Sequence, residues 1–420
     1  MRVFLALALP ALLALTGCVT TPPAQSVAAQ IEARTPVTIL VSIDGFRPDY
    51  LDRGITPALS KLAADGTTSA MRPSFPSKTF PNHWATVTGV RPDRNGIVSN
   101  NIEDPTGKRR PFTMATDDPW WWNATPPIWV DAEKAGIRTA AMFWPGSAVA
   151  FGGTRADAWP NDVTGGTRPQ DWIPFGQAVD GKQRVDTVID WLRRPAATRP
   201  RFVMLYFDTV DTQGHRYGPN SGEVNAAVAD VDRDIARLVD ELAALGQPAN
   251  LVVVADHGMA EGSSDRVIPL ASLASPEDGR AVETGVFATF QKMPGREAAL
   301  AASLSKPRPH VQCWPKGQMP ARFHYGTNPR IPAWFCLAEV GWRILAEPRA
   351  RTGVDGDHGY DNDASDMRAL FIASGPAFAR GTTLPTFDNV DVYPLLREVI
   401  GLPAATGVDG TIAPVRGALR

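Results

Sequence analysis

Four continuous apolar runs along the chain each end in a polar or glycine-containing segment. They cover residues 37–43, 202–207, 251–255 and 369–373. Apolar runs of this length, without polar alternation, are typical of strands that are buried on both faces of a parallel sheet. The first three runs lead directly into segments that carry Asp or His side chains.

Helical patterns lie between these runs. Apolar residues from Val224 to Leu245 recur on one helical face and stop before Gly246, a residue type that commonly ends helices. A shorter pattern of the same kind runs from Val185 to Leu192. The alternation of strands and helices predicts an α/β fold with a central, mostly parallel sheet flanked by helices. Ligands of such sheets bind at the carboxyl ends of the strands, where the Asp and His segments begin.

Residues 262–355 show no strong strand pattern and contain two of the three cysteines. We interpret them as an inserted cap region within one catalytic domain that covers residues 36–420. No internal repeat or long low-complexity segment interrupts that domain.

The amino terminus predicts export. Residues 1–17 combine one Arg, an apolar stretch and small residues, the layout of a signal peptide. The end of this stretch resembles a bacterial lipobox, in which Cys18 is lipidated and anchors the protein to a membrane through a tether at residues 18–35. Val19 rather than Asp follows the cysteine, which favours an outer-membrane lipoprotein facing the bacterial periplasm. The alternative is ordinary signal-peptide cleavage, with Cys18 incidental.

The cysteine count follows from this compartment. If Cys18 is lipidated, Cys313 and Cys336 remain, and an even pair in an oxidising compartment predicts a disulfide. The alternative is a pair of buried free thiols. The net charge of −2, with Lys and Arg spread along the chain, predicts no binding to a nucleic-acid polymer, so we expect a small-molecule substrate.

The candidate chemistry lies in acidic and imidazole side chains at the predicted strand ends and in one glycine-rich loop. Three imidazoles and three carboxylates share these segments: Asp44, Asp211, His215, Asp256, His257 and His358. Mixed His and Asp ligation suits zinc, and six ligands suit two Zn²⁺ ions with open positions for substrate. Two-metal sites usually act on a phosphoryl centre. Each element alone is weak evidence, but their joint occurrence at strand ends is much stronger.

A nucleophile candidate lies between Phe75 and His83. Thr79 stands two residues before Pro81, a residue type favoured at helix starts, and a helix amino terminus offers its dipole and free N–H groups to phosphate. The alternative is that Ser77 and Thr79 only cap this helix.

A set of motifs in order then gives a specific resemblance. The chain resembles the nucleotide pyrophosphatase/phosphodiesterase family (type I phosphodiesterases) of the alkaline phosphatase superfamily, from about residue 37 to about residue 400. The motifs that carry the resemblance lie at residues 41–47, 75–83, 96–101, 127–130, 143–147, 211–219, 255–259 and 358–362.

The resemblance implies a two-zinc phosphodiesterase that releases nucleoside 5′-monophosphates through a covalent intermediate on Thr79. Asn100 and the Thr79 backbone N–H would stabilise charge on the phosphoryl oxygen, and Phe80 and Tyr206 would flank the nucleoside base. Family ligands map onto seven residues here. One zinc would be held by Asp44, Asp256, His257 and the Thr79 oxygen, and the other by Asp211, His215 and His358.

Some features depart from the family or keep other functions open. No Tyr occurs between Trp144 and Tyr206, so Phe151, Trp159 and Trp172 are the candidates for a second base wall. The aromatic cluster at residues 120–122 keeps open a phospholipid-headgroup (choline phosphate) phosphodiesterase, because quaternary ammonium groups bind aromatic cages. An alkaline phosphomonoesterase of the same superfamily is a further competing function, and a zinc-binding surface protein is the competing function outside enzymes.

Overall fold

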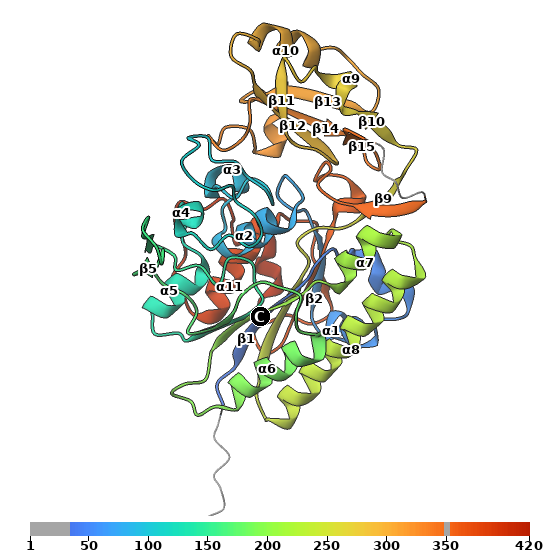
Figure 1. Cartoon of the computed structure of the whole chain (residues 1–420). Coiled ribbons are helices and arrows are strands. Elements are labelled where there is room, and N and C mark those ends of the chain that lie inside the picture. The colour runs from blue at the N-terminus through green and yellow to red at the C-terminus, as the bar shows by residue number, and fades with distance from the viewer. Residues whose placement is uncertain (1–33, 348–352) are drawn as a thin grey trace, which may run out of the picture. The chain divides into compact units, whose positions relative to one another are not determined.

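The computed structural model describes residues 34–347 and 353–420 (Figure 1). The predicted signal peptide, Cys18 and nearly all of the predicted tether lie outside the described residues. Thr35–Arg420 forms one compact unit. Within the described ranges, no helix is both long enough and apolar enough to cross a membrane.

An eight-stranded, mostly parallel sheet forms the centre of this unit, which confirms the predicted α/β class. In the middle, β1 pairs in parallel with β7 and with β8, so that Ile39 lies between Val203 and Leu251. All seven residues of β1 are buried, as expected for a strand with helices on both sides. In spatial order the strands are β18 (Thr382–Thr383), β2 (Thr67–Met71), β17 (Ala369–Ser374), β8 (Ala249–Val254), β1 (Val37–Ile43), β7 (Phe202–Phe207), β3 (Thr139–Met142) and β6 (Asp171–Ile173).

The apolar run at residues 369–373 corrects one expectation, because β17 is not a parallel strand. It runs antiparallel to both of its neighbours, β2 and β8. A run that is buried on both faces has the same pattern in either direction, so the sequence does not reveal strand polarity. The reversal puts the start of β17 at the sheet edge where β1, β7 and β8 end, and His358 approaches that edge from the segment before β17.

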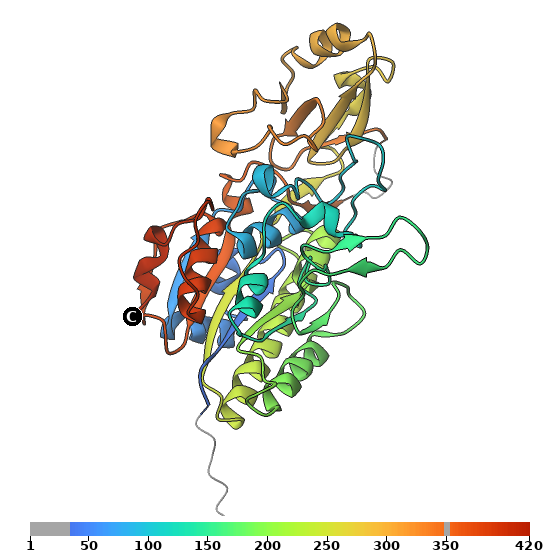
Figure 2. The ribbon, with the colours of Figure 1, turned by 90° about the vertical axis from the view of Figure 1, so that its left-hand side faces the viewer.

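Helices cover both faces of the sheet (Figure 2). On one face α8 packs against α1, α6 and α7, while α2 packs against α11 and α3. The two predicted helices are confirmed as α6 and α8. The α-helices outside the insertion are α1 (Pro57–Asp65), α2 (Thr79–Thr88), α3 (Pro92–Asn95), α4 (Pro119–Trp122), α5 (Ile128–Lys134), α6 (Gly181–Arg193), α7 (Thr209–Tyr217), α8 (Gly222–Ala244) and α11 (Val392–Ile400). Short 3-10 helices cover Pro48–Arg53, Ala321–Phe323, Ser365–Met367, Asn389–Asp391 and Ala413–Ala418, and β4 (Thr154–Arg155) pairs with β5 (Val163–Thr164).

The chain between β9 (Ala260–Ser263) and β16 (Val354–Asp357) forms a second sheet. β9 and β16 themselves pair with each other. We call the described residues between them, 264–347, the inserted segment. Its sheet is antiparallel with the order β11-β12-β14-β13, and it has its own small hydrophobic core. The strands are short, and the outer two, β11 and β13, are only partly buried, which explains the weak strand pattern of this region. The elements are β10 (Val267–Pro269), α9 (Leu270–Leu273), β11 (Gly279–Glu283), β12 (Phe287–Lys292), α10 (Glu297–Leu304), β13 (Val311–Pro315), β14 (Trp334–Ala338) and β15 (Arg343–Leu345).

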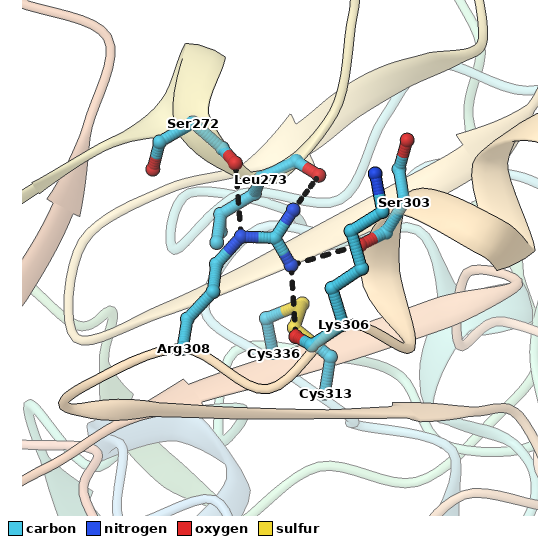
Figure 3. The surroundings of a disulfide bond; sticks show 7 residues. All are labelled: Ser272, Leu273, Ser303, Lys306, Arg308, Cys313 and Cys336. Carbon is cyan, nitrogen blue, oxygen red and sulfur yellow. Dashed lines mark hydrogen bonds between the residues drawn. A yellow bond between two sulfur atoms is a disulfide. The ribbon is translucent and has the colours of Figure 1, made fainter.

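Cys313 and Cys336 are bonded to each other, as predicted (Figure 3). They face each other directly across β13 and β14, so the bond joins the two strands at matched positions. Beside them, the Arg308 guanidinium donates hydrogen bonds to four backbone carbonyls, which ties the chain before β13 to the ends of α9 and α10. These carbonyls belong to Ser272, Leu273, Ser303 and Lys306.

Candidate active site

Two groups of side chains meet at the edge of the sheet where β1, β7 and β8 end. The first group consists of Asp44, directly after β1, and Asp256 and His257, after β8. The His257 Nε2 atom lies 2.8 Å from Asp256 Oδ2 and 3.5 Å from Asp44 Oδ1. Gly45 turns the chain after Asp44 with a φ of 68°, and a Cβ there would lie 3.1 Å from Asp211 atoms. Glycine at this position therefore lets the second group approach the first.

The second group consists of Asp211, His215 and His358. Asp211 and His215 are four residues apart on α7, so they lie on one face of that helix. The His358 Nε2 atom lies 3.1 Å from His215 Nε2 and 3.6 Å from Asp211 Oδ1. The rings of His257 and His358 stack with centroids 3.5 Å apart, which places the two groups side by side.

All three imidazoles in these groups are oriented by backbone carbonyls. The Nδ1 atoms of His215, His257 and His358 lie 3.0, 2.9 and 2.8 Å from the carbonyl oxygens of Gly356, Gly258 and Ser77. A carbonyl only accepts, so each Nδ1 carries the proton and each Nε2 presents a lone pair. This is the arrangement that metal-binding histidines usually have.

Unpartnered oxygens show that the residues fit metal ions. Asp44 Oδ1, Asp211 Oδ1 and Asp256 Oδ2 are buried and accept no hydrogen bond. Buried anionic oxygens without partners are costly, as are two facing imidazole lone pairs. A cation in each group removes both problems, because the three ligand atoms of each group lie within 4.8 Å of one another. The donor set of imidazole and carboxylate is one that zinc accepts.

Burial and neighbouring charges shift the pKa values of these groups. Burial raises the pKa of Asp44 well above its usual value, and the charges of Asp256 and Asp211 raise it further. Burial, together with Asp211, likewise raises the pKa of Asp256. Burial and the neighbouring His257 lower the pKa of His358. A bound divalent cation favours ionised carboxylates and neutral imidazoles, so it opposes the shifts at the two carboxyl groups and favours the neutral form of His358.

Thr79 lies beside the first group, at the start of α2. Its Oγ1 is 3.4 Å from His257 Nε2. The residue before the helix is Lys78, and no side chain caps the helix, while the Ser77 hydroxyl donates to the Tyr360 carbonyl. Neither Ser77 nor Thr79 therefore serves as the cap of α2.

Asn100 is held against the same helix start. Its Oδ1 accepts a hydrogen bond of 2.9 Å from the backbone N–H of Phe80. An amide oxygen accepts and an amide nitrogen donates, so this bond leaves the Nδ2 group of Asn100 available to donate. Asn100 and Thr79 both line one pocket of about 560 Å³, together with Asp44, Asp211, His215 and His358.

Two further residues support the first group and the adjoining Thr79. The Tyr206 hydroxyl donates a hydrogen bond of 2.6 Å to Asp44 Oδ2. His83 lies between the Ser42 hydroxyl and the Thr79 carbonyl, at 2.8 Å from each, and burial lowers its pKa to about 3. A neutral His83 can donate to the carbonyl and accept from the hydroxyl. Tyr206 lines the pocket, but its hydroxyl is bound to a candidate metal ligand rather than free for a base.

The aromatic wall of the pocket differs from the expectation. Phe80 is only 1% exposed and is not among the lining residues. Its ring packs against Phe175, with centroids 5.0 Å apart, and Phe175 lines the pocket. Sequence reasoning missed Phe175, which follows β6 in a loop without any pattern. The three candidates for the second base wall do not line the pocket: Phe151, Trp159 (89% exposed) and Trp172.

The aromatic cluster at residues 120–122 is not an open cage. Trp121 and Trp122 are buried, and Trp122 packs against Phe80, Phe112 and Trp84. Trp120 packs edge-on against Trp121. These rings belong to the core behind the pocket, and none of them is among the pocket-lining residues.

The fold and the paired Asp/His groups define a protein of the alkaline-phosphatase-like class. The sequence pattern that defines the type I phosphodiesterase/nucleotide pyrophosphatase family matches residues 38–361, and the chain belongs to that family of enzymes. It is 34% identical over 372 residues to bis(5′-adenosyl)-triphosphatase enpp4 of Xenopus laevis, covering 88% of this chain and 78% of that protein. It is 35% identical to mouse ectonucleotide pyrophosphatase/phosphodiesterase family member 1, covering 88% of this chain but 41% of that longer protein. Among solved structures, an inactive form of murine ectonucleotide pyrophosphatase/phosphodiesterase 5 in complex with AMP matches with a TM-score of 0.84 and 29% identity, covering 92% of this chain and 100% of that chain.

Proposed function

We propose that the protein is a two-zinc enzyme that hydrolyses nucleotide pyrophosphate and phosphodiester bonds to nucleoside 5′-monophosphates through a covalent intermediate on Thr79. The observation that carries this proposal is the position of Thr79. The residue starts a helix, touches the first metal-capable group, and opens onto a pocket that the second group also lines.

The six Asp and His residues would hold the two ions. Asp44, Asp256 and His257, with the Thr79 oxygen, would hold one, and Asp211, His215 and His358 would hold the other. Two Zn²⁺ ions lower the pKa of a nucleophilic hydroxyl and neutralise charge on the attacking and leaving oxygens of a phosphoryl transfer.

The chain's own residues divide the reaction between them. Thr79 Oγ attacks phosphorus, forming an oxygen–phosphorus bond while the bond to the leaving oxygen breaks and the hydroxyl proton ends on the leaving group. Water then attacks phosphorus, returns a proton to Thr79 and releases the nucleoside 5′-monophosphate. Asn100 Nδ2 and the Thr79 backbone N–H donate to the non-bridging oxygen on which charge develops. Tyr206 and His83 hold Asp44 and the Thr79 carbonyl in place.

The pocket favours a nucleotide over the competing substrates. Phe175 offers an aromatic face for a base, with Phe80 packed behind it and Tyr206 beside it at 5.3 Å between ring centroids. Arg216 is the single Lys or Arg among the described residues that line the pocket, and no described carboxylate pairs with it. A cation beside the second group suits a polyphosphate leaving group and disfavours the quaternary ammonium of choline.

Export is part of the proposal. The disulfide between Cys313 and Cys336 suits an oxidising compartment, in line with the predicted signal peptide. Lipidation of Cys18 and outer-membrane attachment remain our proposal for residues outside the described ranges. Metabolic labelling with a radioactive fatty acid should mark the wild-type chain and leave a Cys18→Ala variant unlabelled; equal labelling of both would contradict it.

A hydrolysis panel tests the catalytic proposal. Metal-replete protein is given ATP, a dinucleoside polyphosphate, glycerophosphocholine and a phosphomonoester, and the products are separated by chromatography. We expect nucleoside 5′-monophosphate from the first two substrates and loss of that activity after chelation. Elemental analysis should find about two zinc ions per chain, the number that two ligand groups can hold. Preferred hydrolysis of the monoester or of glycerophosphocholine would overturn the nucleotide assignment.

A further inference from the structure

Side chains of the inserted segment hold the loop that carries Asn100 in place. Three side chains of that segment reach three residues of the loop, at positions 96, 98 and 99. The Arg330 guanidinium donates to the Gly96 carbonyl at 2.7 Å, and the Tyr325 hydroxyl donates to the Val98 carbonyl at 2.9 Å. The third side chain, Glu283, contacts the residue directly before Asn100.

Glu283 lies at the end of β11 and accepts from the Ser99 hydroxyl with both carboxylate oxygens, at 2.9 and 2.8 Å. Ser99 is buried and Glu283 is partly buried, so water has limited access to this hydrogen bond. A hydrogen bond to an ionised carboxylate is among the stronger and more directional contacts in proteins. It therefore limits the rotation of the backbone that leads into Asn100.

The inserted segment also reaches the residue before Thr79. The Lys78 ammonium lies 5.7 Å from the centre of the Phe287 ring on β12 and 3.7 Å from Asp357 Oδ1. Burial raises the pKa of Glu283 to about 7, and the positive charge of Lys78 opposes this rise. The inserted segment thus reaches the residues directly before Asn100 and Thr79.

We propose that Glu283 is a positioning residue, which holds the Ser99–Asn100 backbone so that the Asn100 amide faces the phosphoryl site. The inference rests on the proposed role of Asn100 and goes beyond it by giving the inserted segment a part in the reaction. Even partial burial of a carboxylate has a cost in stability, and a contact made only to attach the segment would not need one.

A double-mutant cycle on Asn100→Ala and Glu283→Ala tests this inference, with kcat and KM measured on one nucleotide substrate. We expect Glu283→Ala to lower kcat about 10-fold with little change in KM, a coupling within the range known for contacting residues. In the Asn100→Ala background, Glu283→Ala should have almost no further effect, because there is no amide left to position. Glu283→Gln keeps an acceptor for Ser99 and should restore most of kcat.

Two further variants keep the inference falsifiable if Glu283→Ala does not fold. Ser99→Ala removes the donor and should lower kcat in the same way, again only when Asn100 is present. Glu339→Gln is the matched control, since Glu339 belongs to the inserted segment but pairs with His310, and it should leave kcat unchanged.

The outcomes separate the two proposals. If Asn100→Ala alone leaves kcat unchanged, the proposed role of Asn100 fails, and this inference fails with it. If Asn100→Ala lowers kcat but Glu283→Ala and Ser99→Ala do not, the positioning role alone is wrong. If Glu283→Ala lowers kcat by the same factor with and without the Asn100 side chain, its effect is a general structural one. That result would also overturn the inference.

Discussion

The two metal-capable groups differ in their access to solvent. In the first group the side chains of Asp44, Asp256 and His257 are 2%, 1% and 0% exposed. In the second group the side chains of Asp211 and His215 are 16% and 38% exposed. The first group follows two central strands, β1 and β8, whereas the second takes two of its three ligands from α7, beside the pocket. The buried first group lies next to Thr79, which suits activation of the nucleophile. The more exposed second group suits stabilisation of a leaving group that must depart into solvent.

Among the variants that test this comparison, Thr79→Ala should have the largest effect on turnover. Removing the hydroxyl removes the covalent route, so turnover should fall to background. Each group keeps its three Asp and His ligands, so the metal content should not change. Thr79→Ser retains a hydroxyl and should keep part of the activity. Substantial turnover by purified Thr79→Ala protein would show that another group is the nucleophile.

Stepwise chelation should remove the ions of the two groups at different chelator concentrations. Ligands that are partly exposed exchange their ion more easily, so dialysis against increasing chelator should first remove the ion of the second group and leave about one ion per chain. Elemental analysis at each step measures this. His215→Ala should likewise retain one ion, whereas Asp256→Asn should lose the ion next to Thr79. Loss of both ions in a single step from the wild-type protein would remove the distinction between the groups.

Tyr206→Phe should weaken the first group selectively. It removes the hydrogen bond to Asp44 but keeps the ring, and the loss of such an outer partner typically costs about 10- to 100-fold in metal affinity. Competition with a chromophoric chelator measures that affinity. Tyr393→Phe, whose hydroxyl contacts Arg397 instead, is the matched control and should bind metal normally. An unchanged affinity in Tyr206→Phe would show that Asp44 does not depend on this hydrogen bond.

The contrast also explains what the sequence could predict. Asp44, Asp256 and His257 directly follow apolar strands, so their meeting at one sheet edge follows from parallel pairing. Phe175 and Glu283 carry no such signal. Phe175 lies in a loop, and Glu283 contacts Ser99 from a position 184 residues further along the chain. The direction of β17 was also hidden, because burial on both faces leaves the same apolar run in either direction.

Arg216 gives the smallest expected effect and the sharpest test of the open side of the site. It follows His215 on α7 and lines the pocket next to the second group. If that group faces the leaving oxygen, Arg216 should contact a leaving group that carries phosphate and not one that lacks phosphate. Arg216→Ala should therefore lower kcat/KM for ATP about 10-fold, the value of one hydrogen bond to a charged group. The same variant should hydrolyse the nitrophenyl ester of a nucleoside 5′-monophosphate at the wild-type rate. Arg233→Ala on α8, where the arginine pairs with Asp230, is the matched control. If Arg216→Ala lowers kcat/KM equally for both substrates, Arg216 does not contact the leaving group. The proposed difference in function between the two metal groups would then lose this support.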